Sequence, residues 1–132
     1  MREACLPAGE LKQRKFNQMT LKEIKDILKA TAIYQPDNYE DLVVQSACCA
    51  DLMSDVLYYH APNSLLITGL TQSSVIRTAE IAGITAIVFV FNKKPDPQTI
   101  ELARQKKIPL FSTPLCMYNA SGILHKAGLQ GS

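Results

Sequence analysis

The feature that most constrains the fold is a regular alternation of short apolar runs with amphipathic segments in the second half of the chain. The apolar runs cover residues 65–68, 86–91 and 109–112. Residues 87–90 are apolar at every position, and a strand of this kind needs cover on both faces. The alternation therefore predicts a three-layer α/β fold, with helices flanking a mainly parallel sheet.

Local signals place the helices between these strands. The first is predicted to start with Thr71 as its N-cap and to end at Gly83, a residue suited to the left-handed conformation after a helix. The second has Asp96 as its cap and Pro97 in its first turn. The third is predicted over residues 114–128.

The first half of the domain has a less regular pattern. Thr20 and Glu23 form a capping box, which predicts a helix from residue 21 onward. Short strands are expected at 32–34 and 42–48, followed by a helix over 51–59. The apolar face predicted for that last helix consists of Leu52, Met53, Val56 and Leu57.

Length and composition agree with one domain. The chain has 132 residues, of which 47% are hydrophobic and 20% charged, enough apolar material for one core. No run reaches the roughly 20 apolar residues that cross a bilayer, and the N-terminus does not resemble a signal peptide. We therefore expect a cytoplasmic protein. Residues 1–18 are interpreted as an N-terminal extension for which disorder is an open alternative, and residues 19–132 as the domain.

The distribution of charge argues against a nucleic-acid partner. Residues 1–30 carry seven Lys or Arg against four Asp or Glu, whereas the remaining 102 residues carry seven against eight. The body of the domain is thus almost neutral, and no basic stripe with interleaved aromatic residues is present. We expect neither a nucleic acid nor a membrane as a partner.

The four cysteines do not form a recognisable metal motif. Cys5, Cys48, Cys49 and Cys116 contain no C-x-x-C pair. Cys48 and Cys49 are expected to alternate faces of a strand as small buried residues. We predict no cofactor, and a cysteine redox or iron–sulfur protein remains the less favoured alternative.

Motifs of the common enzyme classes are also missing. The sequence has no phosphate loop, dinucleotide fingerprint, zinc-protease helix or nucleophile elbow. His60 and His125 are predicted at helix ends, where the helix dipole accounts for them. Asp51 and Asp55 would share a helix face, with Asp55 stabilising the first turn. No catalytic or metal-binding residue is predicted, and the chain is interpreted as a non-enzymatic module.

Hydroxyl-rich turns follow two of the predicted strands. In open parallel sheets, ligands bind at the carboxyl ends of strands, where helix N-termini present free N–H groups. A small anionic metabolite or nucleotide could be held there, whereas plain helix capping is the alternative. The predicted ligand-binding residues are Thr68, Gly69, Thr71, Gln72, Ser73, Ser112 and Thr113.

Five segments together resemble the DRTGG domain family. They cover residues 50–57, 66–69, 84–88, 94–96 and 108–114, and the resemblance extends from about residue 20 to the end. It implies a fold similar to the N-terminal domain of HPr kinase/phosphorylase. The name-giving D-R-T-G-G string is absent, and residues 68–74 are its nearest equivalent.

This resemblance implies regulation. Related domains occur between CBS domains in regulatory pyrophosphatases that bind adenine nucleotides, and other members occur near genes of iron-only hydrogenases. The kinase activity of HPr kinases belongs to a separate domain with a phosphate loop. The leading hypothesis is therefore a ligand-sensing homodimer. A pure dimerisation or protein-interaction domain is the alternative, and a phosphotransferase is less favoured.

Overall fold

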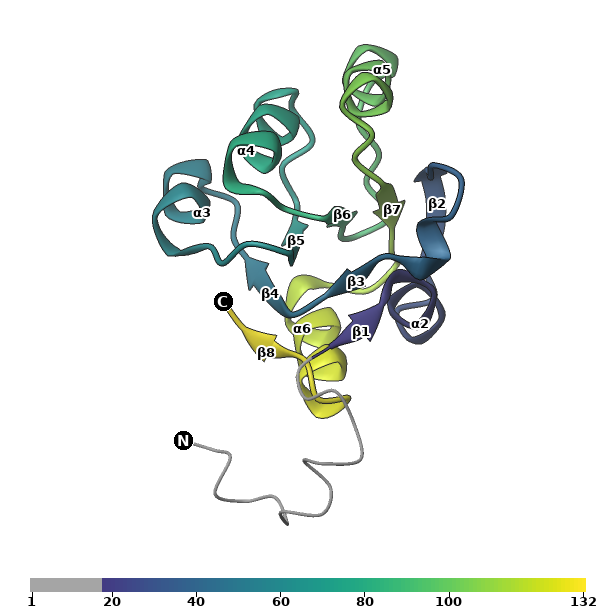
Figure 1. Cartoon of the computed structure of the whole chain (residues 1–132), viewed down its shortest axis with the longest axis vertical. Helices are drawn as coiled ribbons and strands as arrows, with labels where there is room; N and C mark the ends of the chain where they lie inside the picture. Colours follow the sequence, from purple (N-terminus) through teal and green to yellow (C-terminus); the bar gives the residue numbers. More distant parts are fainter. Residues whose placement is uncertain (1–17) are drawn as a thin grey trace.

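The computed structural model describes residues 18–132 (Figure 1). The strands are β1 (Met19–Thr20), β2 (Thr31–Tyr34), β3 (Val43–Val44), β4 (Ser46–Cys49), β5 (Ser64–Thr68), β6 (Ala86–Phe89), β7 (Leu110–Ser112) and β8 (Gln130–Gly131). The helices are α2 (Leu21–Ile27), α3 (Met53–Tyr59), α4 (Ser74–Ala82), α5 (Pro97–Lys106) and α6 (Met117–Lys126), with a 3-10 helix, η2 (Tyr39–Asp41). Of the predicted extension, all but Gln18 lies outside the described residues.

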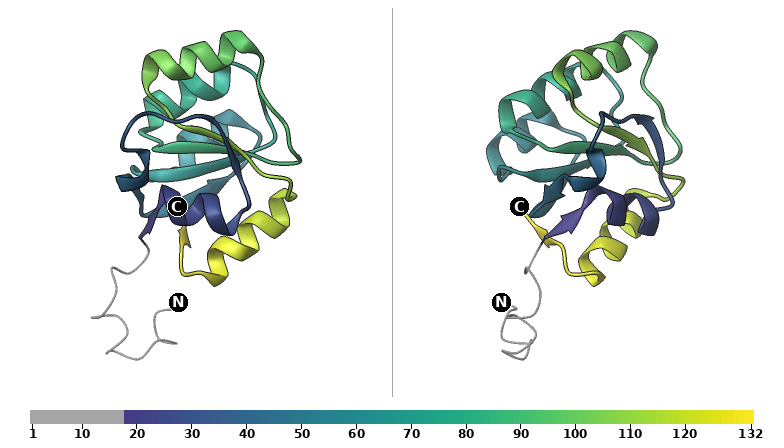
Figure 2. Two further views of the ribbon diagram at one scale, coloured as in Figure 1. Left: turned by 90° about the vertical axis from the view of Figure 1, so that its right-hand side faces the viewer. Right: turned by 45° about the vertical axis from the view of Figure 1, so that its right-hand side comes forward.

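The main sheet has six strands in the order β2-β7-β6-β5-β4-β8. Every pair from β8 to β7 is parallel, and only the edge strand β2 runs antiparallel, against β7. Helices α3, α4 and α5 cover one face, while α2 and α6 cover the other (Figure 2). The predicted three-layer, mainly parallel α/β fold is confirmed.

Strand residues divide the core into two halves because successive side chains point to opposite faces. Leu66 and Ile87 pack in the cluster beneath α3, α4 and α5, whereas Leu65 and Val88 pack in the cluster beneath α2 and α6. All four side chains are fully buried. This two-sided burial explains why the central strands are apolar at every position.

Three predicted helix boundaries are confirmed in atomic detail. Thr20 and Glu23 form the reciprocal capping box before α2. Gly83 ends α4 with a φ of 71°, in the left-handed region. Asp96 caps α5, and its Oδ1 accepts a hydrogen bond from the N–H of Thr99 at 2.8 Å. Each signal depends on residues within a few positions of one another, which is why the sequence predicts it well.

The predicted strand over 42–48 is wrong as a single element. Its first part forms β3 and pairs with β1 in a separate two-stranded sheet, while its second part forms β4 in the main sheet. The break lies at Gln45, whose N–H donates to the carbonyl of Asn63 at 2.8 Å. A partner distant in sequence therefore divides a run that looks continuous.

Three helices begin later than predicted. Helix α3 starts at Met53 rather than Asp51, and Leu52 is 61% exposed, so the predicted apolar face of that helix is wrong; Val56 is its one fully buried side chain. Helix α4 starts at Ser74, so Thr71 is not its N-cap. Helix α6 starts at Met117, three residues after Pro114, with Cys116 as its cap.

The late starts of α4 and α6 have a common cause. After β5, the hydroxyl of Thr68 accepts a hydrogen bond from the N–H of Leu70 at 3.1 Å. After β7, the hydroxyl of Thr113 accepts one from the N–H of Leu115 at 3.3 Å. Side-chain bonds of this type offer the backbone an alternative to the helix, so each strand is followed by a turn before the helix begins.

Candidate functional site

The predicted site residues meet at one edge of the sheet but do not form one cluster. Thr68 and Ser112 are the last residues of β5 and β7, and Gly69 and Thr113 follow them directly. Because β6 lies between these strands, the two groups are separated by two strand spacings, about 10 Å. Any ligand that contacts both groups has to span the end of β6.

Three predicted hydroxyls are committed to bonds within the protein. Thr68 donates to Oδ1 of Asp51 at 3.0 Å. Ser112 donates to the carbonyl of Lys93 at 2.8 Å, and Thr113 donates to the carbonyl of Leu28 at 2.6 Å. Thr68, Ser112 and Thr113 are also buried. Their hydrogen bonds fix the loops at this edge.

The other predicted residues are more accessible. Gln72 and Ser73 are exposed and Thr71 is half-buried, all in the turn that leads into α4. Ser73 occupies the N-cap position without a capping bond from its side chain. Within residues 18–132, none of these three side chains makes a hydrogen bond. These side chains are therefore free to contact a ligand near the positive end of the α4 dipole, whereas the N–H groups of Val75 and Ile76 already donate to the carbonyls of Gln72 and Ser73.

Two residues that the sequence analysis did not select lie beside this turn. Asp51, in the loop after β4, accepts the N–H of Gly69 at 2.7 Å in addition to the Thr68 hydroxyl. Lys93, in the loop after β6, donates from Nζ to the carbonyl of Gly69 at 3.2 Å. Both follow predicted strands, a signal that could have found them. The expected sharing of a helix face by Asp51 and Asp55 is wrong, because Asp51 precedes α3.

The side chains of Asp51 and Lys93 both lie beside Gly69. A Cβ at this position would lie 3.4 Å from Nζ of Lys93 and 3.6 Å from Oδ1 of Asp51. Those are contact distances, so a longer side chain would compete with Lys93 for the same space. The edge thus presents an ammonium group, a carboxylate and free hydroxyls from three successive loops.

The loop after β6 has an unusual backbone. Phe91 and Asn92 are consecutive residues with φ values of 59° and 58°. Asn tolerates this left-handed region, whereas for a bulky residue it costs roughly 1–2 kcal/mol. Hydrogen bonds hold the conformation: the N–H of Phe91 donates to Leu115 O at 3.0 Å, and that of Asn92 to Thr113 O at 2.8 Å. Phe91 is 60% exposed.

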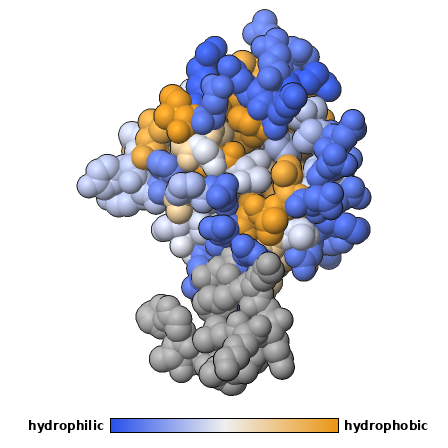
Figure 3. Space-filling view, in the orientation of Figure 1, coloured by the Kyte–Doolittle hydropathy of each residue, from blue (hydrophilic) through white to orange (hydrophobic). Residues whose placement is uncertain are grey.

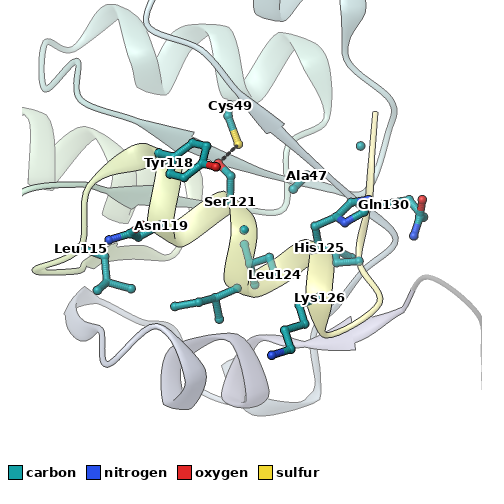
Figure 4. A pocket seen from close by; sticks show the side chains of 14 residues that line it. Ala47, Cys49, Leu115, Tyr118, Asn119, Ser121, Leu124, His125, Lys126 and Gln130 are labelled. Carbon is teal, nitrogen blue, oxygen red and sulfur yellow. Dashed lines mark hydrogen bonds between the residues drawn. The ribbon is translucent and has the colours of Figure 1, made fainter.

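A hollow lies elsewhere, between α6 and the strands β4 and β8 (Figure 4). Its volume is about 1040 Å³, and none of the predicted site residues lines it. We call it the α6 groove. On this side of β4, β8 pairs only with Ser46 and Ala47, so Cys48 and Cys49 pair with β5 alone. Its lining residues are Ala47, Cys49, Leu115, Tyr118, Asn119, Ser121, Gly122, Ile123, Leu124, His125, Lys126, Leu129, Gln130 and Gly131.

Cys48 and Cys49 point to opposite faces of β4, as predicted. Cys48 packs toward α3 and α4, while Sγ of Cys49 lies 3.1 Å from Oγ of Ser121 on α6 (Figure 4). The predicted burial is wrong for both residues, because Cys48 is half-buried and Cys49 is exposed. Partial burial of their sulfur atoms raises the pKa of both thiols, so they are poor nucleophiles at neutral pH.

The remaining titratable residues of the sequence analysis have local roles. Nδ1 of His60, at the end of α3, lies 3.0 Å from the carbonyl of Leu57, and His125 lies in the last turn of α6. In the part of the chain that the structure describes, no three His, Cys, Asp or Glu side chains are grouped so that they could hold a metal ion. None of the described helices is long and apolar enough to cross a membrane.

Comparison with known proteins identifies the family to which this α/β domain belongs. The family model of the DRTGG domain matches residues 23–127, and the chain belongs to this family. No curated protein matches the sequence significantly.

A solved structure shares the fold: the CBS and DRTGG domains of the regulatory region of Clostridium perfringens pyrophosphatase, complexed with the activator diadenosine tetraphosphate. The TM-score is 0.68 at 19% identity, and the match covers 80% of this chain and 45% of that chain. The chain therefore corresponds to less than half of that regulatory region.

Proposed function

We propose that this protein is a non-enzymatic regulatory module that senses a small anionic ligand, a nucleotide or another phosphorylated metabolite, at the carboxyl edge of its sheet. The observation that carries the proposal is the position of Lys93. Its ammonium group reaches back to the carbonyl of Gly69, directly before the turn that enters α4. A cation and a helix N-terminus then favour the same negative charge.

The ligand contacts are assigned to the accessible part of the predicted site. Thr71, Gln72 and Ser73 would donate to the anion together with Lys93. Thr68, Ser112 and Thr113 would act indirectly, because their hydroxyls already hold the loops in place. The nucleotide activator of the C. perfringens pyrophosphatase region supports a ligand of this class.

A regulatory role also agrees with the chemistry of the edge. Asp51 and Lys93 both lie beside Gly69, and one oxygen of Asp51 already accepts two hydrogen bonds. An acid or base in catalysis has to exchange protons with a substrate, whereas Asp51 holds the ends of two loops together. We therefore assign it a positioning role.

The test is thermal unfolding in the presence of ADP or inorganic phosphate. A specific ligand at 100 times its Kd stabilises the folded state by about 2.7 kcal/mol, which raises Tm by several degrees. We expect Lys93→Ala to abolish the shift and Lys94→Ala, an equally exposed neighbour, to retain it. An unchanged Tm with both probes, or an equal shift in Lys93→Ala, would contradict the proposal.

A second candidate function is assembly, favoured by the α6 groove. Tyr118 is 85% exposed and Ile123 37% exposed along this groove, and apolar surface of this kind often marks a protein interface. In this interpretation the chain is a homodimer joined through α6, and the hydroxyl-rich turns only shape the ends of helices. Both functions are compatible in one molecule, because the groove and the Lys93 edge share no residue.

Light scattering after size exclusion tests the assembly function. The matched pair of variants is Ile123→Glu in the groove and Ile81→Glu on α4, where Ile81 is 74% exposed. Helix α4 covers the opposite face of the sheet, and an apolar area is visible over it in Figure 3. We expect a dimer that Ile123→Glu dissociates and Ile81→Glu preserves. A monomer at high protein concentration, or loss of the dimer only in Ile81→Glu, would contradict assembly through α6.

A further inference from the structure

An exposed aromatic side chain lies two residues before Lys93, in a conformation that its own chemistry disfavours. Phe91 has a φ of 59° and is 60% exposed. Gly or Asn would occupy this position with less strain, and burial in the core does not explain the phenylalanine. These observations point to a role of Phe91 at the surface of the protein.

The surrounding hydrogen bonds keep this aromatic ring at the carboxyl edge. Backbone bonds from Phe91 and Asn92 tie their loop to the segment that connects β7 with α6. The Ser112 hydroxyl bonds to the carbonyl of Lys93 and fixes the far end of the same loop. Residues two positions apart are separated by at most about 7 Å between their Cα atoms, so one ligand can reach both Phe91 and Lys93.

We propose that Phe91 is a stacking platform for the base of a nucleotide whose phosphate group is held by Lys93. This inference rests on the proposed function and narrows its ligand from a small anion to an anion that carries a flat aromatic ring. Stacking of a base on an exposed aromatic side chain is a common mode of recognition and depends little on which base is present. A platform held rigidly by the backbone loses little freedom when the base binds.

A protein partner is the less suitable occupant of this surface. Asn92, Lys93 and Lys94, which follow Phe91 directly, are all exposed polar residues. The centre of a protein interface is depleted of lysine and forms a continuous apolar area. An exposed aromatic ring two residues from the Lys93 ammonium group matches a nucleotide, which combines an apolar face with a charged end.

The experiment compares two probes, ADP and inorganic pyrophosphate, by titration calorimetry on the full chain. Pyrophosphate supplies the charge without the base. We expect Phe91→Asn to weaken ADP binding about tenfold or more and to leave pyrophosphate binding unchanged. Asn suits the left-handed conformation, so this variant is expected to fold. Phe91→Tyr restores the ring and should restore the affinity for ADP, while Asn92→Gly is the matched control that retains both affinities.

The outcomes separate this inference from the proposed function. Equal losses for both probes in Phe91→Asn, or no loss for either, would overturn the stacking role without contradicting anion binding by the wild-type chain. Failure of the wild-type chain to bind either probe would overturn both. Wild-type preference for ADP over pyrophosphate, lost in Phe91→Asn and kept in Phe91→Tyr, would establish the platform.

Discussion

The N–H of Gly69 donates a hydrogen bond of 2.7 Å to Oδ1 of Asp51, which joins the loop after β4 to the loop after β5. The hydroxyl of Thr68 donates to the same oxygen at 3.0 Å. Asp51 therefore holds Gly69 in place, and the carbonyl of the same residue accepts the hydrogen bond from Lys93. The geometry of the candidate ligand site depends on this carboxylate, although the ligand itself need not contact it.

Replacement of Asp51 by alanine should destabilise the fold by about 2 kcal/mol, because the buried Thr68 hydroxyl loses its acceptor. The free energy of unfolding in urea measures the loss. Thr68→Val removes the donor as well, and the double variant should lose less than the sum of the two single variants. Strict additivity would show that the Asp51–Thr68 bond does not contribute to stability.

The left-handed residues that end α4 and α5 predict opposite effects of substitution on stability. Gly83 has a φ of 71° and open space around its Cβ position. Gly83→Ala should therefore lower the free energy of unfolding by about 1–2 kcal/mol through backbone strain alone. Lys107 ends α5 with a φ of 58°. Lys107→Gly should raise the free energy of unfolding by about 0.5–1 kcal/mol, because the relief of backbone strain exceeds the entropic cost of glycine. Thermal unfolding of both variants is the measurement, and shifts in the same direction would contradict the strain argument.

Gly122 lies inside α6 with no atom within 4 Å of its Cβ position. Gly122→Ala should stabilise the isolated chain by about 0.5–1 kcal/mol, because alanine favours the helix. Urea unfolding at low and high protein concentration checks this. Destabilisation only at high concentration would mean that a second copy occupies the space beside Gly122, as the assembly function requires.

Asp96 predicts a specific pH dependence. Hydrogen bonds from Thr99, chiefly from its backbone N–H, lower the pKa of Asp96 from its usual 3.8. The charged form is favoured in the folded state, so the stabilisation is complete above pH 3.8 and is lost as the pH falls through the lowered pKa. Asp96→Ala should therefore have a lower Tm than the wild type at pH 7, and the difference should shrink below pH 3.8. A difference that grows on acidification would contradict the assignment.

Much of the architecture could be predicted from local patterns. The signals that were predicted correctly act on neighbours a few positions away. They are the capping residues Thr20 and Asp96, the helix-ending Gly83 and the apolar strand at 86–89. Their effects do not depend on how the rest of the chain folds. The predictions failed where a distant segment competes, as when Asn63 divides the 42–48 run.

The candidate site was predictable only in part. Its edge of the sheet follows from the strand order, and Thr71, Gln72 and Ser73 are accessible there. The sequence offered no means of knowing that Thr68, Ser112 and Thr113 would bond internally, since two of their acceptors, Asp51 and Leu28, lie 17 and 85 residues away. Lys93 was missed because its target, Gly69, is 24 residues away.

The sequence by itself determined the alternation of strands and helices in the second half of the chain and the mainly parallel sheet, because periodicity and capping are properties of short segments. Only the tertiary structure decided which polar groups remain accessible, where Lys93 places its charge, and that the α6 groove lies between α6, β4 and β8. Those features arise from contacts between residues that are brought together only when the layers pack. The residue type fixes which hydrogen-bond donors and acceptors a side chain has, whereas the fold fixes which partners they meet.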